Sequence, residues 1–235
     1  MNLNQYIPSR VVLLFRRLKF YIFGEKFYKK FNYDWHKYSH RFDIINNIIK
    51  YKKYNSYLEI GCQADVSFKK ILAPDKIGVD PMDGGTHRMT SDDFFKTNQK
   101  TFDIIFIDGL HEYSQVLRDI KNSIKFLNEN GIILVHDCLP AKIWHQTMPQ
   151  THSSWNGDVW KAIVECRTIE NIDTYTCIAD QGLGVVFNKK NKNLLDINIK
   201  DFKKLRFKDY YLNHKKYMNL IDENELYNLI NSLKY

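Results

Sequence analysis

Two strand-length apolar segments, separated by a helical pattern, constrain the fold of this chain more than any other feature. Residues 102–108 read FDIIFID, and residues 131–138 read GIILVHDC. Between them, residues 114–128 carry apolar side chains along one helical stripe. Strands that are apolar throughout are typical of a parallel sheet with helices on both faces. These segments therefore predict an α/β fold.

The alternation of strand and helix patterns continues along most of the chain. We expect further strands at residues 56–62, 76–81, 87–90, 174–180 and 183–189. We expect further helices at residues 41–51, 66–72, 91–97 and 158–167. Ser91 is the expected N-cap of one helix, and Asn130 with Gly131 is expected to close the helix before the strand at 131–138. Gln181 and Gly182 suit a hairpin, so the pattern predicts a three-layer α/β domain that ends in an antiparallel pair of strands.

The length and composition allow one substantial hydrophobic core. The chain has 235 residues, of which 44% are hydrophobic. We expect an N-terminal helical extension at residues 1–50, a catalytic domain at 51–190 and a C-terminal helical extension at 191–235. The last of these is lysine- and asparagine-rich and predicts one or two polar helices.

The net charge limits the kinds of partner that we expect, and the cysteines indicate the cellular compartment. The formal net charge of +8 fits surface lysines that favour solubility, but it also fits an anionic substrate or an acidic membrane surface. No arginine-rich arm or zinc-finger spacing accompanies it, so we expect no nucleic-acid partner. The four cysteines form no C-x-x-C pair, which predicts free thiols and a cytoplasmic protein.

Residues 11–24 form an apolar stretch that is interrupted by Arg16, Arg17 and Lys19. The stretch is too short and too charged to span a bilayer, and it has no signal-peptide cleavage site. The favoured interpretation is a helix that docks on the core or on a second subunit of a homo-oligomer. The alternative is peripheral contact with an anionic membrane surface.

Acidic side chains follow four of the predicted strands. Ligands of open parallel sheets bind at the carboxyl ends of the strands, where this sequence places Glu59 with Gly61, then Asp80, Asp108, and His136 with Asp137. Asp80 could bind both hydroxyls of a ribose, or it could simply form the turn before Pro81. The loop at residues 59–65 has a single glycine, which favours a ligand with a ribose but no phosphates.

Taken in order, several of these segments resemble the class I S-adenosylmethionine-dependent methyltransferases. The segments are YLEIGC, KIGVDP, MTSDDFF, FDIIFIDGLHEYSQVLRDI, GIILVHDCLP and GDVWKAI, and the resemblance covers roughly residues 41–189. It is nearest to a bacterial group associated with glycan and capsule pathways. It implies a Rossmann-like sheet and S-adenosylmethionine as the cofactor. The implied cofactor-binding residues are Glu59 and Gly61 near the methionine part, Asp80 at the ribose, Ser91 and Asp92 by the adenine, and Asp108 beside the sulfonium.

The sequence also resembles metal-dependent sugar O-methyltransferases at two places. This resemblance implies that Asp108, His136 and Asp137 bind Mg²⁺ or another divalent metal, which would lower the pKa of an acceptor hydroxyl. Without a metal, His111 or His136 could be the general base beside Asp108. Both interpretations are kept as expectations for the catalytic residues Asp108, His111 and His136.

The loop at residues 140–158 is long for a compact domain and predicts a substrate lid. His145, His152, Trp155 and Asn156 are its expected substrate contacts, whereas Trp160 is expected in the core. We predict methyl transfer to a hydroxyl of a sugar or nucleotide-linked acceptor in surface-glycan biosynthesis. N-methylation of a small phosphorylated amine and a non-catalytic cofactor-binding module are the alternatives.

Overall fold

A computed structural model of the protein describes residues 8–232, and the strands of this part of the chain form a single sheet. The sheet order is β2-β1-β3-β4-β6-β5-β7. The strands are β1 (Ser56–Ile60), β2 (Asp75–Val79), β3 (Phe102–Ile107), β4 (Leu127–Val135), β5 (Asp173–Cys177), β6 (Leu183–Phe187) and β7 (Leu220–Ile221). β2, β1, β3 and β4 are parallel, and β6 pairs antiparallel with both β4 and β5. The predicted Rossmann-like α/β sheet with a terminal hairpin is confirmed.

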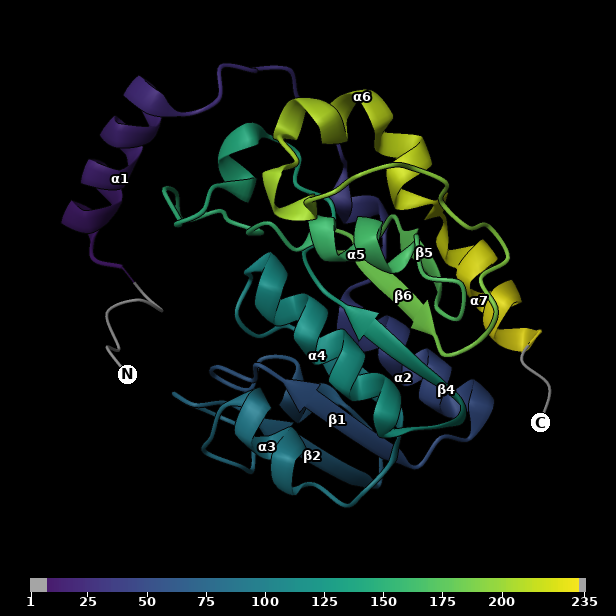
Figure 1. Cartoon of the computed structure of the whole chain (residues 1–235). Coiled ribbons are helices and arrows are strands. Elements are labelled where there is room, and N and C mark those ends of the chain that lie inside the picture. Colours follow the sequence, from purple (N-terminus) through teal and green to yellow (C-terminus); the bar gives the residue numbers. More distant parts are fainter. Residues whose placement is uncertain (1–7, 233–235) are drawn as a thin grey trace.

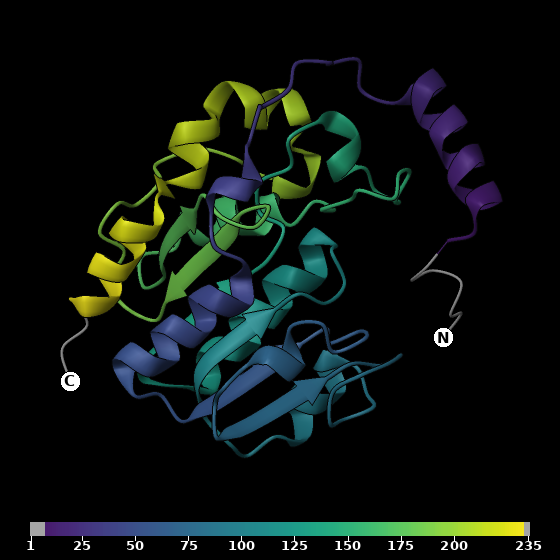
Figure 2. The ribbon, with the colours of Figure 1, turned by 180° about the vertical axis from the view of Figure 1, so that it is seen from behind.

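Helices cover both faces of this sheet (Figure 1). These helices are α2 (Arg41–Lys52), α3 (Ser91–Thr97), α4 (Tyr113–Lys125), α5 (Trp160–Cys166), α6 (Phe207–Met218) and α7 (Glu223–Asn231). A further helix, α1 (Arg10–Phe23), lies away from the sheet. Helices α3 to α6 contribute buried side chains to one core cluster, and α2 and α7 contribute to the other, which lies on the face shown in Figure 2. In β3, Ile105 and Ile107 belong to the first cluster, whereas Ile104 and Phe106 belong to the second. This burial on both faces explains why the strand is apolar throughout.

The helix before β4 ends earlier than predicted. α4 stops at Lys125, and β4 begins at Leu127 with a register shift against β3. Asn130, with a φ of 61°, and Gly131 therefore lie inside the strand, where they do not cap the helix. A side chain at position 131 would meet the backbone oxygens of Asp103 and Asn128 at 2.9 Å, so the irregular ladder needs a glycine there.

Three other local predictions differ from the structure. The cap of α3 is Thr90, whose hydroxyl accepts the Asp93 N–H at 3.1 Å, and Ser91 is the first helical residue. Residues 66–72 form only a 3₁₀ turn at Phe68–Lys70. The predicted strand at 87–90 is reduced to one bridge between Val79 and His87, because the helix begins directly after it.

Segments from both ends of the chain take part in the core. Ile44, Ile45 and Ile48 of α2 are fully buried, as are Phe207 and Met218 of α6. β7, which the sequence did not predict, extends the sheet by pairing with β5. The domain division at residues 50 and 190 stays a prediction, but the core clusters cross both positions.

α1 differs from these segments because none of its residues is buried. It lies at the margin of the molecule in both ribbon views (Figures 1 and 2). The expected docking of residues 11–24 on the core is only partial: Phe20 packs against the first core cluster, whereas most other residues of the helix are exposed. Among the described residues, no helix combines the length and the apolar character needed to cross a bilayer.

Candidate active site

The carboxyl ends of β3 and β4 bring two carboxylates and two imidazoles together. His111 bridges the carboxylates, since its Nε2 lies 3.2 Å from Asp108 Oδ1 and its Nδ1 lies 3.1 Å from Asp137 Oδ2. His136 Nδ1 lies 3.2 Å from the same Asp108 oxygen. The predicted catalytic and metal-binding residues thus form one cluster, which consists of Asp108, His111, His136 and Asp137.

Two further charged residues complete the cluster, and sequence reasoning missed both. Asp180 lies 3.6 Å from His136 Nε2 through Oδ1, and its Oδ2 accepts the Arg41 Nη1–H at 3.1 Å. Arg41 Nε also lies 3.7 Å from Asp108 Oδ2. Asp137 and Asp180 both have positive φ angles, a strained backbone that is common at functional sites. The only signal in the sequence was the position of Asp180 in the hairpin turn.

Charge pairing within the cluster favours the ionised form of Asp108 and the protonated forms of His136 and His111. Burial raises the pKa of Asp108, but the charge of His136 and the hydrogen bond from His111 outweigh it and hold that pKa well below its usual range. Burial disfavours the charged form of His136, yet Asp108 and Asp137 raise its pKa well above the ordinary value. The pKa of His111 is also raised, because Asp137 and Asp108 outweigh burial. His136 therefore already holds its proton, which argues against a role as general base.

Asp108, His111 and Asp137 are also arranged as a metal site could be. One ligand atom from each lies within 4.8 Å of the others, so the third side chain in this group is His111, where the sequence predicted His136. The buried Nδ1 of His111 has no hydrogen bond of good geometry. Two carboxylates and an imidazole fit a divalent cation, and the imidazole favours a first-row transition metal over Mg²⁺.

The predicted lid, residues 140–158, covers this cluster. Trp155 stacks on the His111 ring, with centroids 5.4 Å apart and planes at 22°. Asn156 donates from Nδ2 to Asp137 Oδ1 at 2.7 Å, which holds that carboxylate from above. Gly157 packs so closely on His111 that an added Cβ would overlap the His111 carbonyl oxygen. Trp155 therefore contacts the predicted catalytic residue His111, and Asn156 contacts the predicted metal ligand Asp137.

The other two predicted substrate contacts of the lid, His145 and His152, contact other residues of the lid. The backbone carbonyl of His145 accepts the Asn156 N–H at 2.8 Å, so His145 supports the position of Asn156. His152 packs against Trp144, with ring centroids 5.7 Å apart. Burial lowers the pKa of both histidines. Trp160 is fully buried, which confirms its place in the core.

The predicted cofactor residues line the neighbouring strand ends. Glu59 is buried and accepts a hydrogen bond from the Tyr57 hydroxyl, and desolvation raises its pKa to about 8. A positively charged ligand group beside Glu59 would favour its ionised form, and S-adenosylmethionine has two such groups, the ammonium and the sulfonium. Gly61, with a φ of 90°, packs directly on the backbone of Asp108.

Asp80 already orders the loops around it. Its Oδ2 accepts the Gln63 N–H at 2.8 Å, and its Oδ1 accepts the N–H groups of Met82 and Asp83 at 2.7 and 3.0 Å. The turn-forming interpretation is therefore seen directly. A carboxylate has about four acceptor positions, so one remains for a ribose hydroxyl.

Ser91 and Asp92 are held against α4. Gln115 donates from Nε2 to Ser91 Oγ at 3.1 Å and to Asp92 Oδ1 at 3.3 Å. Arg118 Nε also donates to Asp92 Oδ1, at 3.2 Å. The roles predicted for these two residues and for Glu59, Gly61 and Asp80 in cofactor binding stay predictions.

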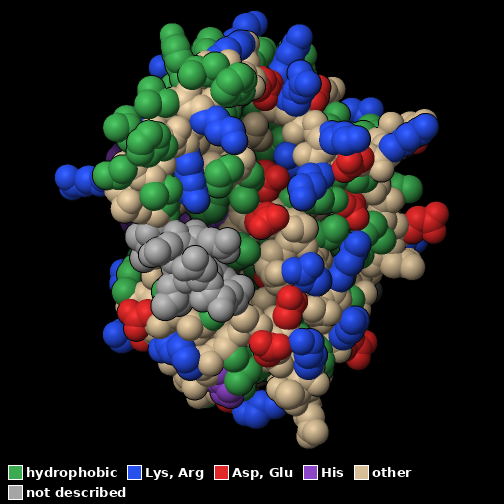
Figure 3. Space-filling view, turned by 60° about the vertical axis from the view of Figure 1, so that its left-hand side comes forward, with side chains coloured by type: hydrophobic (Ala, Val, Ile, Leu, Met, Phe, Trp, Pro, Cys, Tyr) green, Lys and Arg blue, Asp and Glu red, His purple; other side chains and the backbone are tan. Residues whose placement is uncertain are grey.

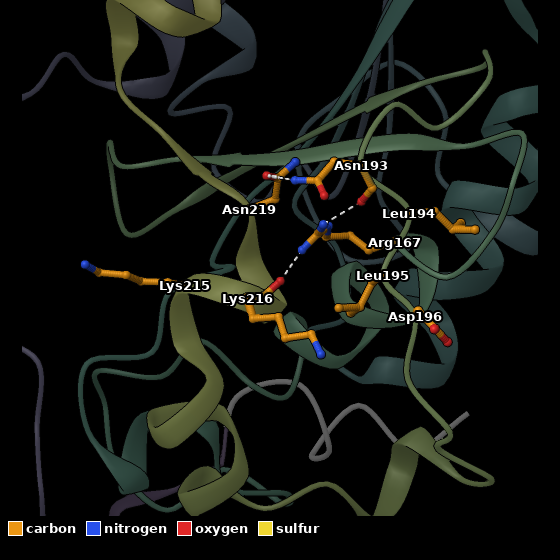
Figure 4. Close-up of a pocket in the computed structure, with 8 residues that line it drawn as sticks. All are labelled: Arg167, Asn193, Leu194, Leu195, Asp196, Lys215, Lys216 and Asn219. Carbon is orange, nitrogen blue, oxygen red and sulfur yellow. Dashed lines mark hydrogen bonds between the residues drawn. The ribbon is translucent and has the colours of Figure 1, made fainter.

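A separate hollow lies at the end of α5 that is remote from this cluster (Figure 4). Arg167 sits at its centre and donates from Nη2 to Asn193 O at 2.7 Å and from Nη1 to the backbone carbonyl of Lys216. A cation at the last carbonyls of a helix is favourable. Arg167 thus joins α6 to the segment after β6, and the hollow contains none of the predicted site residues.

Comparison with known proteins agrees with this architecture. A sequence family described as a methyltransferase domain matches residues 69–138, and no curated protein matches the chain. The SAH-bound methyltransferase PaMTH1 from Podospora anserina has a TM-score of 0.52 at 16% identity, covering 66% of this chain and 81% of its own. Cofactor-bound Rv0187 from MTB has a TM-score of 0.50 at 11% identity, covering 80% of this chain and 95% of its own.

Residues 69–138 therefore match a methyltransferase domain, and the sheet has the fold of the solved methyltransferase PaMTH1.

Proposed function

We propose that the protein transfers the methyl group of S-adenosylmethionine to a hydroxyl of a sugar or a nucleotide-linked sugar in surface-glycan biosynthesis. The observation that carries this proposal is the Asp108–His111–Asp137 group under Trp155. Two carboxylates and an imidazole can hold a cation that activates a hydroxyl, and an indole can stack on a sugar ring. The positive net charge suits a phosphate-bearing acceptor.

The chain's own residues supply positioning and charge. Arg41 and His136 fix Asp108 in its ionised form, and Asn156 orients Asp137. A divalent cation held by Asp108, His111 and Asp137 would lower the pKa of the acceptor hydroxyl. S-adenosylmethionine supplies an activated methyl group, so the residues around it need only align the acceptor for attack along the sulfur–carbon bond.

Two alternatives use the same cluster. Without a metal, His111 would take the acceptor proton, which needs its neutral form although Asp108 and Asp137 raise its pKa. Methylation of a small phosphorylated amine would require an unprotonated nitrogen, and the carboxylates of this site favour the protonated form. The hydroxyl acceptor is therefore preferred.

The proposal is tested by measuring S-adenosylhomocysteine release with a panel of nucleotide-linked sugars. We expect turnover that is lost on chelation and restored by Mn²⁺ or Mg²⁺. Asp108→Asn should lower turnover about a thousandfold, because it removes a charge from the reaction centre. Asp75→Asn, at the opposite end of the sheet, is the matched control and should keep full activity.

Three outcomes decide between the alternatives. Turnover that persists in the presence of a chelator would exclude the metal-dependent mechanism and favour His111 as the general base. Methylated amines as the sole products would overturn the hydroxyl acceptor. Near-normal turnover of Asp108→Asn would contradict the placement of the chemistry.

A further inference from the structure

α1 exposes the apolar face of an amphipathic helix to solvent. Val11, Leu14, Phe15, Leu18 and Ile22 follow the i, i+3, i+4 spacing of one helical face, and each is more than half exposed. The opposite face, with Leu13, Arg16 and Phe20, is half-buried toward the protein. α1 carries eight of the sixteen large exposed hydrophobic side chains in the described part of the chain. The helix is thus oriented with its apolar face away from the body.

The borders of this face are basic. Arg10 and Arg17 lie along one border by their helical positions, Lys19 lies along the other, and α1 has no acidic residue. Figure 3 shows hydrophobic side chains gathered in this region, with Lys and Arg side chains beside them. Cations at both borders of an apolar face suit an interfacial helix whose basic side chains reach anionic headgroups.

We propose that α1 docks this enzyme on an anionic lipid surface, with its apolar face in the interface between headgroups and acyl chains. A second copy of α1 is a poorer occupant, since two such helices packed face to face would bring cations against cations at both borders. A bilayer with anionic lipids offers both an apolar layer and the opposite charge.

The position of α1 gives the docking a consequence for the site. Arg16 Nη1 donates to the Gln150 carbonyl oxygen at 3.4 Å, so α1 contacts the loop that covers Asp137 and His111. A docked α1 would hold this loop close to the membrane surface. The acceptor could then be collected near the bilayer.

The test is co-sedimentation of the full chain with vesicles. We expect binding to phosphatidylcholine vesicles that contain about 30% phosphatidylglycerol, and weak binding to pure phosphatidylcholine. Leu18→Glu should weaken binding about tenfold or more, because it places a charge in the apolar face. Arg17→Glu should weaken it and reduce its dependence on salt. Leu212→Glu, an equally exposed position on α6, is the matched control and should bind like the unaltered chain.

The outcomes separate this proposal from its rivals and from the methyltransferase reaction. The absence of binding to anionic vesicles, or equal binding by Leu18→Glu, overturns it. A dimer in sedimentation velocity that Leu18→Glu dissociates would assign the face to a second copy instead. Vesicle binding is measured without cofactor or acceptor, so it does not depend on the proposed function. The melting temperature of Leu18→Glu should be unchanged, since no residue of α1 is buried.

Discussion

Glu59 shows how one buried carboxyl links cofactor binding to stability. Its pKa is raised to about 8 by desolvation, against 4.5 for an ordinary glutamate. Between these values the folded state binds a proton that the unfolded state lacks, so stability falls as the pH rises through this window. At about 1.4 kcal/mol per pKa unit, the loss is about 4 kcal/mol by pH 8.

Glu59→Gln should remove this dependence, because an amide oxygen still accepts the Tyr57 hydroxyl but does not ionise. We expect the fall in the free energy of unfolding between pH 5 and 8, measured by urea denaturation of the apo protein, to be about 4 kcal/mol smaller in the variant than in the unaltered chain. The same variant should bind S-adenosylmethionine about tenfold more weakly at pH 8, since a cation–carboxylate contact is lost. Glu129→Gln, at an exposed position, is the control and should change neither property. A steep pH dependence that remains in Glu59→Gln would assign the titration to another group.

The residues of the candidate site differ in how well the sequence predicts them. Asp108 and Asp137 follow apolar strands, so the rule for parallel sheets is enough to predict that they lie at one edge. Arg41 and Asp180 are 139 residues apart and meet only because α2 and the hairpin turn reach the same edge. No local pattern marks such a pair. The choice between His111 and His136 as metal ligand also depended on side-chain directions that spacing does not give.

At the scale of elements, the segment before α2 packs on α6 through a buried histidine. The Tyr33 hydroxyl lies 2.7 Å from His214 Nε2, and the Phe31 ring lies 4.1 Å from the His214 ring. Burial lowers the pKa of His214 from 6.5 to about 4. The unfolded state therefore binds more protons between these values, and stability falls as the pH drops from about 6.5 to 4.

The burial of neutral His214 should therefore lower the free energy of unfolding by about 3 kcal/mol at pH 4, compared with its value above pH 6.5. His214→Gln should lose it, so the variant should show a smaller fall in the free energy of unfolding between pH 6.5 and 4 than the unaltered chain. Denaturant titration at several pH values measures the slope. His36→Gln, at an exposed position in the same N-terminal segment, is the comparison and should keep the full slope. Identical slopes in both variants would show that His214 is not the titrating group.

The elements themselves were predicted best where packing and local preference agree. β3 is buried on both faces and has the composition of a central strand, so its bounds differ from the prediction only at Asp108. Asn130 and Gly131 have the preferences of a helix end, yet they lie in the irregular part of β4 between Leu127 and Ile132, the residues that pair with β3. The local signal thus marks the irregularity in the strand and not the end of the helix. Pairing partners lie far apart in the sequence, which is why such a correction needs the structure.

At the scale of the whole molecule, side chains of the C-terminal segment take part in the core. Phe207, Tyr210, Met218 and Leu226 are fully buried, and β7 continues the sheet. Losing one large buried side chain costs about 2–5 kcal/mol, and a domain has about 5–15 kcal/mol in total. A chain that ends at residue 190 should therefore fail to unfold cooperatively in calorimetry.

Removal of residues 1–24 is the matched control for this truncation. α1 has no buried residue, and Glu25, which accepts the Phe207 N–H at 2.9 Å, is retained. We expect the melting temperature to change little. A cooperative transition in the chain that ends at residue 190 would support the predicted domain boundary at that residue.

The sequence by itself determined the sheet, the succession of its main strands along the chain and the edge at which Asp108, His136 and Asp137 meet. Those properties follow from the period of apolar side chains and from strand direction, both of which are local. The tertiary structure alone decided which histidine joins the two aspartates, that Arg41 and Asp180 support them, and that the apolar face of α1 points to solvent. Each of these depends on which distant segments meet, and that is set by the packing of the whole core.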